Sequence, residues 1–272
     1  MRSNQLSYPP AKDYYKRKMR IIRFKNKTGE IQYGWISQEK VGIIQGDPFG
    51  EFRRFEPTFL LSELELMLPC LPSKIIAISN NYPDRVRELE AEMPDFPIIL
   101  LKPPSALITN GEAIILPAQS SQVEHEAELA IVVGKEAKNL SLANAREAIF
   151  GYTIANDLTA RDIQLIDKQS TRAKSFDSFC PVGPWIDTDF DPSDAMISCH
   201  VNQVLRQMAS TKDLHFKSEQ LMIFISSIMT LNPGDLILTG TPDGVGTLED
   251  GDIVSVNIAG LGNLVNPVKK AS

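Results

Sequence analysis

The segment VEHEAELAIVVG, residues 123–134, decides how this chain folds. Its second half is an aliphatic run of the kind found in strands. Successive side chains of a strand point to opposite faces, so Glu126 and Glu128 share one face. Ala127 and Leu129 take the other face. The segment is therefore predicted to be a strand that presents two carboxylates together.

Further β-like runs lie on both sides of this segment, and strands outnumber helices along the chain. The runs are KIIAIS (74–79), PIILLKP (97–103), AIILP (113–117), GYTIAND (151–157), DLILTG (235–240) and DIVSVNI (252–258). They do not alternate regularly with helices, which argues against a doubly wound dinucleotide-binding fold. The predicted class is α+β, with a β-rich core of mixed or antiparallel sheet.

Two segments have the pattern of helices. Between residues 218 and 230 the apolar residues recur at the spacing of one helix face, Ser218 can cap the start, and Pro233 bars continuation. The second predicted helix covers residues 142–149 and follows Ser141 as a candidate cap.

The N-terminal quarter of the chain is predicted to be a separate unit of short strands. It contains three short strand-like runs, MRIIRF (19–24), IQYGWI (31–36) and VGIIQG (41–46). Prolines 69 and 72 then favour an extended connector. We predict a flexible N-terminal arm at residues 1–18, a small β-rich domain at 19–70 and a larger domain at 71–272.

Charge and composition exclude several classes of function. The chain has 272 residues, a net charge of -6 and a pI of about 5.2, which opposes binding to nucleic acid or to an anionic membrane surface. No secretory signal and no apolar stretch of membrane-spanning length is present, so a cytoplasmic protein is expected. The three scattered cysteines are expected to be buried small hydrophobes rather than disulfide partners or metal ligands.

The paired carboxylates favour a metal site. Side chains two positions apart on a strand have Cβ atoms roughly 7 Å apart, and their mutual repulsion is removed by a cation between them. Asp157, at the polar end of the GYTIAND run, is a candidate third ligand. Three carboxylates suit hard cations such as Mg²⁺, Mn²⁺ or Ca²⁺. Only three histidines are present and none is in a ligand pattern, which argues against zinc.

A simpler alternative exists for each of these residues. Glu124, Glu126 and Glu128 could line a solvated strand face, with Asp157 capping a turn. His125 alternates to the face opposite Glu126, so we interpret it as an outward-facing or core histidine and not as a ligand.

Five motifs occur in order between residues 74 and 268. They are EHEAELAIVVGK, GYTIANDLTARDIQ, AKSFDSFCPVGPWI, MTLNPGDLILTGTPDGVG and GDIVSVNIAGLGNLVNPV. In order and spacing they resemble the fumarylacetoacetate hydrolase family. The resemblance implies a β-sandwich roll of mixed sheet, a small N-terminal domain, a homodimer, a divalent metal and a small 2-oxo acid as substrate.

The resemblance also assigns roles to individual residues. It places the metal ligands at Glu126, Glu128 and Asp157. It places contacts to the 2-oxo acid at Arg161, Gln164, Lys174 and Thr241, with Lys102 as a weaker candidate. Cationic side chains of this kind hold a carboxylate and the enolate oxygen that develops beside it. The alternatives are a surface role for Lys174, an exposed pair between Arg161 and Asp162 or another acid, and a turn role for Thr241.

One segment departs from the family pattern. In NNYPDRVRELEAE, residues 80–92, Arg85 stands where many members have a histidine, while the glutamate three residues later is kept as Glu88. A helix over residues 84–92 would place both on one face. A guanidinium stays charged and cannot act as a base. Glu88 could then be the base, with Arg85 binding a second substrate carboxylate; the alternative is an ordinary surface pair.

Three functions follow from these patterns. The first is metal-dependent hydrolysis or decarboxylation of a C–C bond in a 2-oxo or β-diketo acid, through a stabilised enolate. The second is isomerisation or tautomerisation of an unsaturated 2-oxo diacid, which loss of the histidine harms less. The third is a degenerate member that binds such an acid without turning it over.

Overall fold

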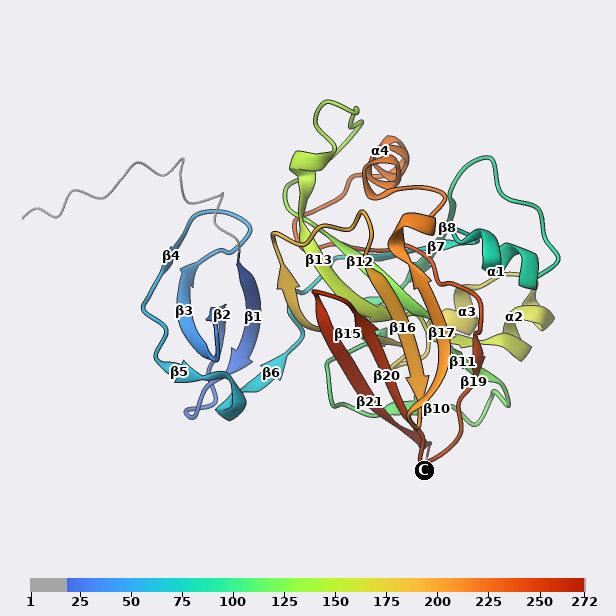
Figure 1. Cartoon of the computed structure of the whole chain (residues 1–272), viewed down its shortest axis with the longest axis horizontal. Coiled ribbons are helices and arrows are strands. Elements are labelled where there is room, and N and C mark those ends of the chain that lie inside the picture. Colours follow the sequence, from blue (N-terminus) through green and yellow to red (C-terminus); the bar gives the residue numbers. More distant parts are fainter. Residues whose placement is uncertain (1–18, 272) are drawn as a thin grey trace, which may run out of the picture.

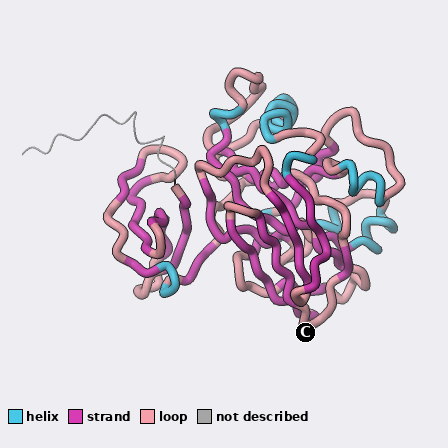
Figure 2. Tube along the Cα trace, in the orientation of Figure 1, coloured by secondary structure: helices cyan, strands magenta, loops and turns pink. Residues whose placement is uncertain are grey.

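The computed structural model describes residues 19–271 (Figure 1). The predicted N-terminal arm, residues 1–18, lies outside the described residues. Strands dominate the structure and the few short helices lie around them (Figure 2). The prediction of a β-rich α+β fold is confirmed.

The N-terminal strands form an antiparallel meander at one side of the molecule (Figure 1). Its strands are β1 (Arg20–Lys25), β2 (Ile31–Ser37), β3 (Lys40–Gly46), β4 (Phe52–Arg54), β5 (Phe59–Leu60) and β6 (Glu65–Met67), with a 3-10 turn at Leu61–Glu63. Ile22, Phe24 and Val41 form a small core between them. The three strand-like runs of this region are therefore confirmed as strands.

The meander is continuous with the main sheet, because β1 pairs antiparallel with β15 (Cys180–Asp187). From β15 the strand order is β13 (Ile149–Asn156), β12 (Ala127–Val133), β18 (Leu236–Leu238), β7 (Ile75–Ser79) and β8 (Ile98–Lys102). β18 and β7 run parallel, whereas the other neighbours in this order are antiparallel. The sheet is mixed, as predicted. β9 (Leu107–Ile108) pairs with β15 beside this order.

A second sheet covers one face of the main sheet and completes a β-sandwich (Figure 1). Its order is β10 (Ile114–Leu116), β21 (Gly262–Lys270), β20 (Ile253–Ile258), β16 (Met196–Val201) and β17 (Val204–Ser210). Ile131 and Ile154 of the main sheet share one buried cluster with Val256 and Leu264 of the second. Burial of this apolar layer holds the two sheets together.

A third sheet is small and lies beside the candidate site. It consists of β11 (Val123–His125) between β14 (Thr159–Ala160) and β19 (Gly246–Thr247). The helices are α1 (Pro83–Glu88), α2 (Arg161–Asp167), α3 (Thr171–Lys174) and α4 (Ser218–Ile228), with 3-10 turns at Pro104–Ala106, Arg146–Ala148 and Thr211–Asp213. No helix in residues 19–271 is long and apolar enough to cross a membrane.

One predicted helix is wrong and another differs at its ends. Residues 142–148 form turns and a 3-10 turn, and Ile149 begins β13. Leu142 is 81% exposed, so a helix here would bury little apolar surface at its start. The helix predicted at 218–230 is α4. It begins at Ser218, so the residue at the N-cap is Lys217 and not Ser218 as predicted.

The three cysteines, Cys70, Cys180 and Cys199, are free and buried, as predicted. Burial raises the pKa of each thiol to about 12, so none is a reactive thiolate at neutral pH.

Candidate active site

The two glutamates of the opening segment stand where the chain crosses between sheets. Val123–His125 belong to the small sheet and Ala127–Val133 to the main sheet, so Glu126 lies between the two strands. The prediction of one continuous strand is therefore corrected. The backbone N–H of Glu126 donates to Asn156 Oδ1 at 2.9 Å, which fixes the crossing.

Glu126, Glu128 and Asp157 converge despite this break. One carboxylate oxygen from each lies within 4.8 Å of the others, and all three residues are buried. The backbone N–H of Asp157 donates to the carbonyl oxygen of Glu126 at 2.8 Å, which holds the third acid beside the first. A solvated strand face is thus excluded for these acids.

Two buried lysines accompany the acidic cluster. Lys174 Nζ lies 2.6 Å from Asp157 Oδ2 and 3.1 Å from Glu126 Oε2, and it also donates to Thr159 Oγ1. Lys102 Nζ lies 2.7 Å from Asp157 Oδ1. Because Lys174 is only 3% exposed, the alternative of a surface lysine is wrong.

These charges shift the pKa values of the two glutamates in opposite directions. Burial raises the pKa of Glu126, but the cations of Lys174 and Arg161 outweigh burial and lower it to about 2. Burial raises the pKa of Glu128, and the negative charges of Asp157 and Glu126 raise it further. Among residues 19–271, no lysine or arginine lies within ion-pair distance of Glu128, which accepts a hydrogen bond from Gly240 N at 2.6 Å.

This donor set fits a hard divalent cation. Three buried carboxylates supply oxygen ligands, and the repulsion that raises the pKa of Glu128 is the cost that such a cation removes. Glu126, Glu128 and Asp157 are the residues that could hold it.

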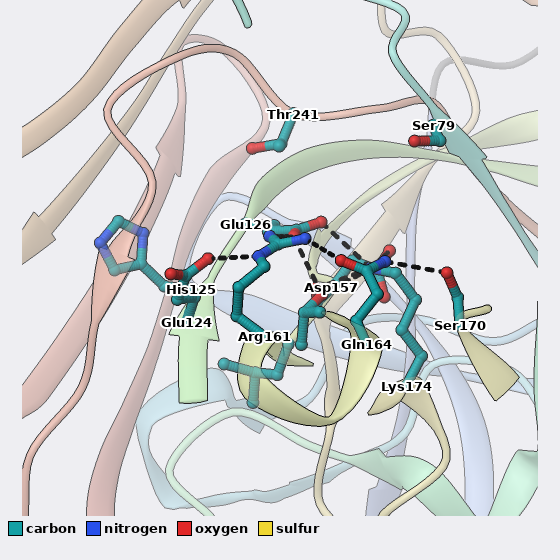
Figure 3. A network of polar contacts seen from close by, with 12 residues as sticks. Ser79, Glu124, His125, Glu126, Asp157, Arg161, Gln164, Ser170, Lys174 and Thr241 are labelled. Atoms are coloured by element: carbon teal, nitrogen blue, oxygen red, sulfur yellow. Dashed lines mark hydrogen bonds and ion pairs between the residues drawn. The ribbon is translucent and has the colours of Figure 1, made fainter. Parts of the chain in front are cut away.

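Arg161, the first residue of α2, is held on three sides (Figure 3). Its Nε donates to Glu124 Oε2 at 2.8 Å and one terminal nitrogen donates to Glu126 Oε1 at 2.7 Å. The other terminal nitrogen donates to Gln164 Oε1, and Gln164 Nε2 donates to Ser170 Oγ at 2.8 Å. Arg161 thus pairs with two other acids, Glu124 and Glu126, and not with Asp162. Because its side chain is only 17% exposed, these are not the exposed pairs of the simpler alternative.

Thr241 lies on the other side of this network (Figure 3). It follows Gly240, whose φ of +102° and close approach to Asn81 exclude a side chain at that position. The small residue lets the backbone approach Glu128, and Thr241 then reaches the pocket. A turn role alone does not describe it.

Arg85 and Glu88 lie on α1, which is shorter than the helix predicted at 84–92. The side chain of Arg85 is 10% exposed and pairs with Glu88 Oε2, while Glu88 Oε1 accepts a hydrogen bond from Gly244 N at 3.2 Å. Arg85 is therefore not part of an ordinary surface pair.

A single small pocket brings most of these side chains together. Its lining includes Arg85, Glu126, Glu128, Asp157, Arg161, Gln164, Lys174 and Thr241. Lys102 is not among the lining residues and touches the site through Asp157. Glu88 does not line it either and reaches it through Arg85.

Sequence reasoning missed two buried residues that support the site. Glu124 holds Arg161, although its place beside Glu126 gave it no separate signal. Gln207, on β17, contacts His125 and Thr241 from a distant part of the sequence, and no local motif marks it. His125 is a core histidine that points away from the acidic cluster (Figure 3).

Family models match nearly the whole described chain. One described as Fumarylacetoacetate (FAA) hydrolase C-terminal matches residues 74–269. Another described as Rv2993c-like, N-terminal matches residues 19–69. The chain is 40% identical over 225 residues to a mitochondrial oxaloacetate tautomerase of Bos taurus, covering 78% of this chain and 72% of that protein.

Solved structures of similar fold include enzymes of different activity. A crystal structure of 2-hydroxyhepta-2,4-diene-1,7-dioate isomerase from Mycobacterium marinum matches with a TM-score of 0.87 and 42% identity, over 93% of this chain and 99% of that one. Maleylpyruvate hydrolase from Sphingobium sp. SYK-6, in complex with manganese(II) and pyruvate, matches with a TM-score of 0.76 and 30% identity, over 93% and 100% of the two chains.

Proposed function

The chain belongs to the fumarylacetoacetate hydrolase family, and from that premise we propose that it is a divalent-metal-dependent isomerase or tautomerase of a small 2-oxo dicarboxylic acid. The single observation that carries this proposal is the placement of Arg85. Its guanidinium lines the same pocket as Arg161, so two forked cations face one cavity. Each suits a carboxylate, and a substrate with two carboxylates uses both.

The pocket supports proton transfer better than hydrolysis. No histidine is among the described residues that line it. Activation of water at neutral pH ordinarily uses a base such as neutral imidazole, and arginine cannot supply that function. Keto–enol interconversion needs only removal and return of a proton beside the 2-oxo group.

A divalent cation held by Glu126, Glu128 and Asp157 would polarise the 2-oxo group and its neighbouring carboxylate. Lys174 remains a cation beside them. Burial alone lowers the pKa of Lys174, but the carboxylates of Asp157 and Glu126 outweigh burial and raise it. Its ammonium group is therefore suited to stabilising negative charge on an enolate oxygen and not to removing a proton.

Arg161 and Gln164 are assigned to the carboxylate next to the 2-oxo group, and Thr241 to a hydrogen bond with the same end of the substrate. Arg85 is assigned to the distal carboxylate. Glu88 is the candidate proton acceptor, because its carboxylate is held by Gly244 N and by Arg85, which lines the pocket. Lys102 supports the site by orienting Asp157.

The activities of similar proteins support this choice. The bovine relative is an oxaloacetate tautomerase, and the mycobacterial structure is that of an isomerase acting on a dienedioate; both names denote diacid substrates. Hydrolysis or decarboxylation of a C–C bond is the second candidate, and the similarity to maleylpyruvate hydrolase favours it. Binding without turnover is the third.

One assay separates the three candidates. Protein loaded with Mg²⁺ or Mn²⁺ is mixed with enol-oxaloacetate, with a 2-hydroxy-dienedioate and with an acylpyruvate, and absorbance and products are followed. We expect rapid loss of the enol or shift of the double bond, with little cleavage of acylpyruvate. Faster cleavage than tautomerisation would support hydrolysis, and oxalate binding without any turnover would support the binding-only role.

We also propose that the protein is a homodimer. β17 is the edge strand of the second sheet, and its Val204, Leu205 and Met208 are 47–59% exposed. An apolar edge strand is commonly covered by a partner. A second copy of this chain is the partner proposed.

A further inference from the structure

Gln207 is a buried amide whose four hydrogen-bonding positions are all used. It lies on β17 and is 1% exposed, while its neighbours Arg206 and Met208 are exposed. Its Oε1 accepts from Ala127 N at 3.0 Å and lies 3.0 Å from His125 Nδ1. A side-chain amide offers one oxygen with two lone pairs and two N–H groups, so the oxygen is fully occupied.

The amide nitrogen faces the opposite side, toward the loop after β18. Gln207 Nε2 donates to Thr241 Oγ1 at 2.8 Å and to the carbonyl oxygen of Pro242 at 2.8 Å. The orientation of the amide is fixed by chemistry, because the Ala127 backbone N–H can only donate and the Pro242 carbonyl can only accept. With the amide turned by 180°, its N–H groups would face the Ala127 N–H and its oxygen would face the Pro242 carbonyl oxygen, so neither hydrogen bond could form.

This orientation determines where the proton of Thr241 points. Because Thr241 Oγ1 accepts from Gln207, the hydroxyl hydrogen of Thr241 remains to be donated elsewhere. Thr241 lines the pocket, so that hydrogen is available to a ligand oxygen. Thr241 thereby becomes a donor to an anionic ligand rather than an acceptor that would repel it.

The same amide also holds the metal-ligand segment. Ala127 lies between Glu126 and Glu128 in the sequence, and its backbone N–H donates a hydrogen bond to Gln207 Oε1. Gly240, next to Thr241, donates to Glu128 Oε2 at 2.6 Å. One side chain therefore fixes the distance between the carboxylate cluster and the donor on the other side of the pocket.

We infer that Gln207 is a positioning residue for substrate binding, which directs the Thr241 hydroxyl toward the carboxylate or 2-oxo oxygen of the substrate. This inference rests on the proposed function, because it requires Thr241 to contact the acid. Gln207 does not line the pocket and acts only through Thr241 and the Ala127 backbone.

The test measures oxalate binding to Mn²⁺-loaded protein by calorimetry in wild type, Thr241→Val, Gln207→Met and the double variant. Loss of one hydrogen bond to a charged ligand weakens binding by roughly tenfold. We expect each single variant to weaken oxalate binding by about that factor. We expect the double variant to bind oxalate no more weakly than the weaker-binding single variant, since Gln207→Met acts on oxalate through the Thr241 hydroxyl that Thr241→Val removes.

Gln207→Glu provides a second and sharper probe. The introduced carboxylate keeps the acceptor for Ala127 N–H but has no N–H for Thr241, so the threonine hydroxyl turns to donate to it. Oxalate binding should then weaken at least as much as in Thr241→Val. If Gln207→Met does not fold, as judged by circular dichroism, this variant decides the test.

Gln45→Met is the matched control, because it makes the same change at an exposed position on β3. It should leave oxalate binding unchanged. The inference is overturned if Gln207→Met and Gln207→Glu bind oxalate like wild type, or if the effects of Gln207→Met and Thr241→Val multiply. Failure of the wild-type protein to bind oxalate in the presence of Mn²⁺ would instead contradict the proposed function, and this inference would fall with it.

Discussion

The backbone N–H of Asp157 donates to the carbonyl oxygen of Glu126 at 2.8 Å. This bond extends the antiparallel pairing of β12 with β13, in which Ala127 stands opposite Asn156. Two carboxylates that flank paired strands, Glu126 before β12 and Asp157 after β13, are thus set side by side by main-chain geometry, and not by the flexible side chains alone. A site built in this way is rigid before any ligand binds.

Removing single ligands should abolish metal binding. We expect Glu128→Gln and Asp157→Asn to weaken Mn²⁺ binding by at least about 100-fold, because each removes a charged oxygen ligand from a three-carboxylate site. Titration followed by electron paramagnetic resonance measures this. Glu147→Gln, an exposed change on the same domain, is the control and should bind Mn²⁺ normally. Unchanged binding in both ligand variants would contradict the metal assignment.

Arg85 should select diacids over monoacids. In Arg85→Met we expect kcat/KM for enol-oxaloacetate to fall by roughly 100-fold, about the 2–3 kcal/mol of a charge-assisted pair. The kcat/KM for enol-pyruvate, which lacks the distal carboxylate, should fall only slightly. Arg87→Met, at an exposed position of the same helix, is the control. An equal loss on both substrates would mean that Arg85 has a structural role only.

Arg85→His should restore the imidazole that many family members carry. The new side chain would sit beside Glu88 and could remove a proton from water, so we expect acylpyruvate hydrolysis to rise at least about tenfold. The ratio of hydrolysis to tautomerisation is the quantity to measure. No change in that ratio would show that the arginine does not determine the reaction type.

Lys174→Met should cost both stability and activity. Removing Lys174 leaves Asp157 with Lys102 and Glu126 with Arg161 as their remaining cationic partners, and breaking a buried pair typically costs about 3–5 kcal/mol. Urea unfolding of the metal-free protein should show this loss, and Mn²⁺ should recover part of it. Lys135→Met, in an exposed pair, should unfold like wild type. A stable but inactive Lys174→Met protein would assign the lysine to chemistry alone.

Leu205→Glu should produce a monomer if β17 is the dimer contact. A charge placed on an apolar edge strand disfavours its burial against a second copy. Light scattering during size-exclusion chromatography measures the mass. Leu165→Glu, at another exposed leucine, on α2, is the control. A wild type that is already monomeric would refute the homodimer directly.

Much of the site could be predicted from residue spacing. The two-residue period placed Glu126 and Glu128 together, and it did so correctly even though the strand is interrupted at Glu126. The interruption itself could not be predicted, because it depends on Asn156 and on a separate small sheet. The division at residues 70–71 stays a prediction.

The parts that sequence reasoning missed involve long-range contacts. Glu124 was grouped with its neighbours, yet it is the partner of Arg161 and is separated from it by 37 positions. Gln207 is separated from His125 by 82 positions. The helix predicted at 142–149 is wrong because the pattern does not show how little of the segment is buried: Leu142 is 81% exposed.

The most direct test of the central claim is anomalous diffraction at the manganese edge from crystals grown with Mn²⁺ and oxalate. We predict one strong peak between the carboxylate oxygens of Glu126, Glu128 and Asp157, with oxalate beside it and within reach of Arg161. A peak elsewhere, or an ammonium group of Lys174 between these carboxylates with no metal at saturating Mn²⁺, would contradict the claim.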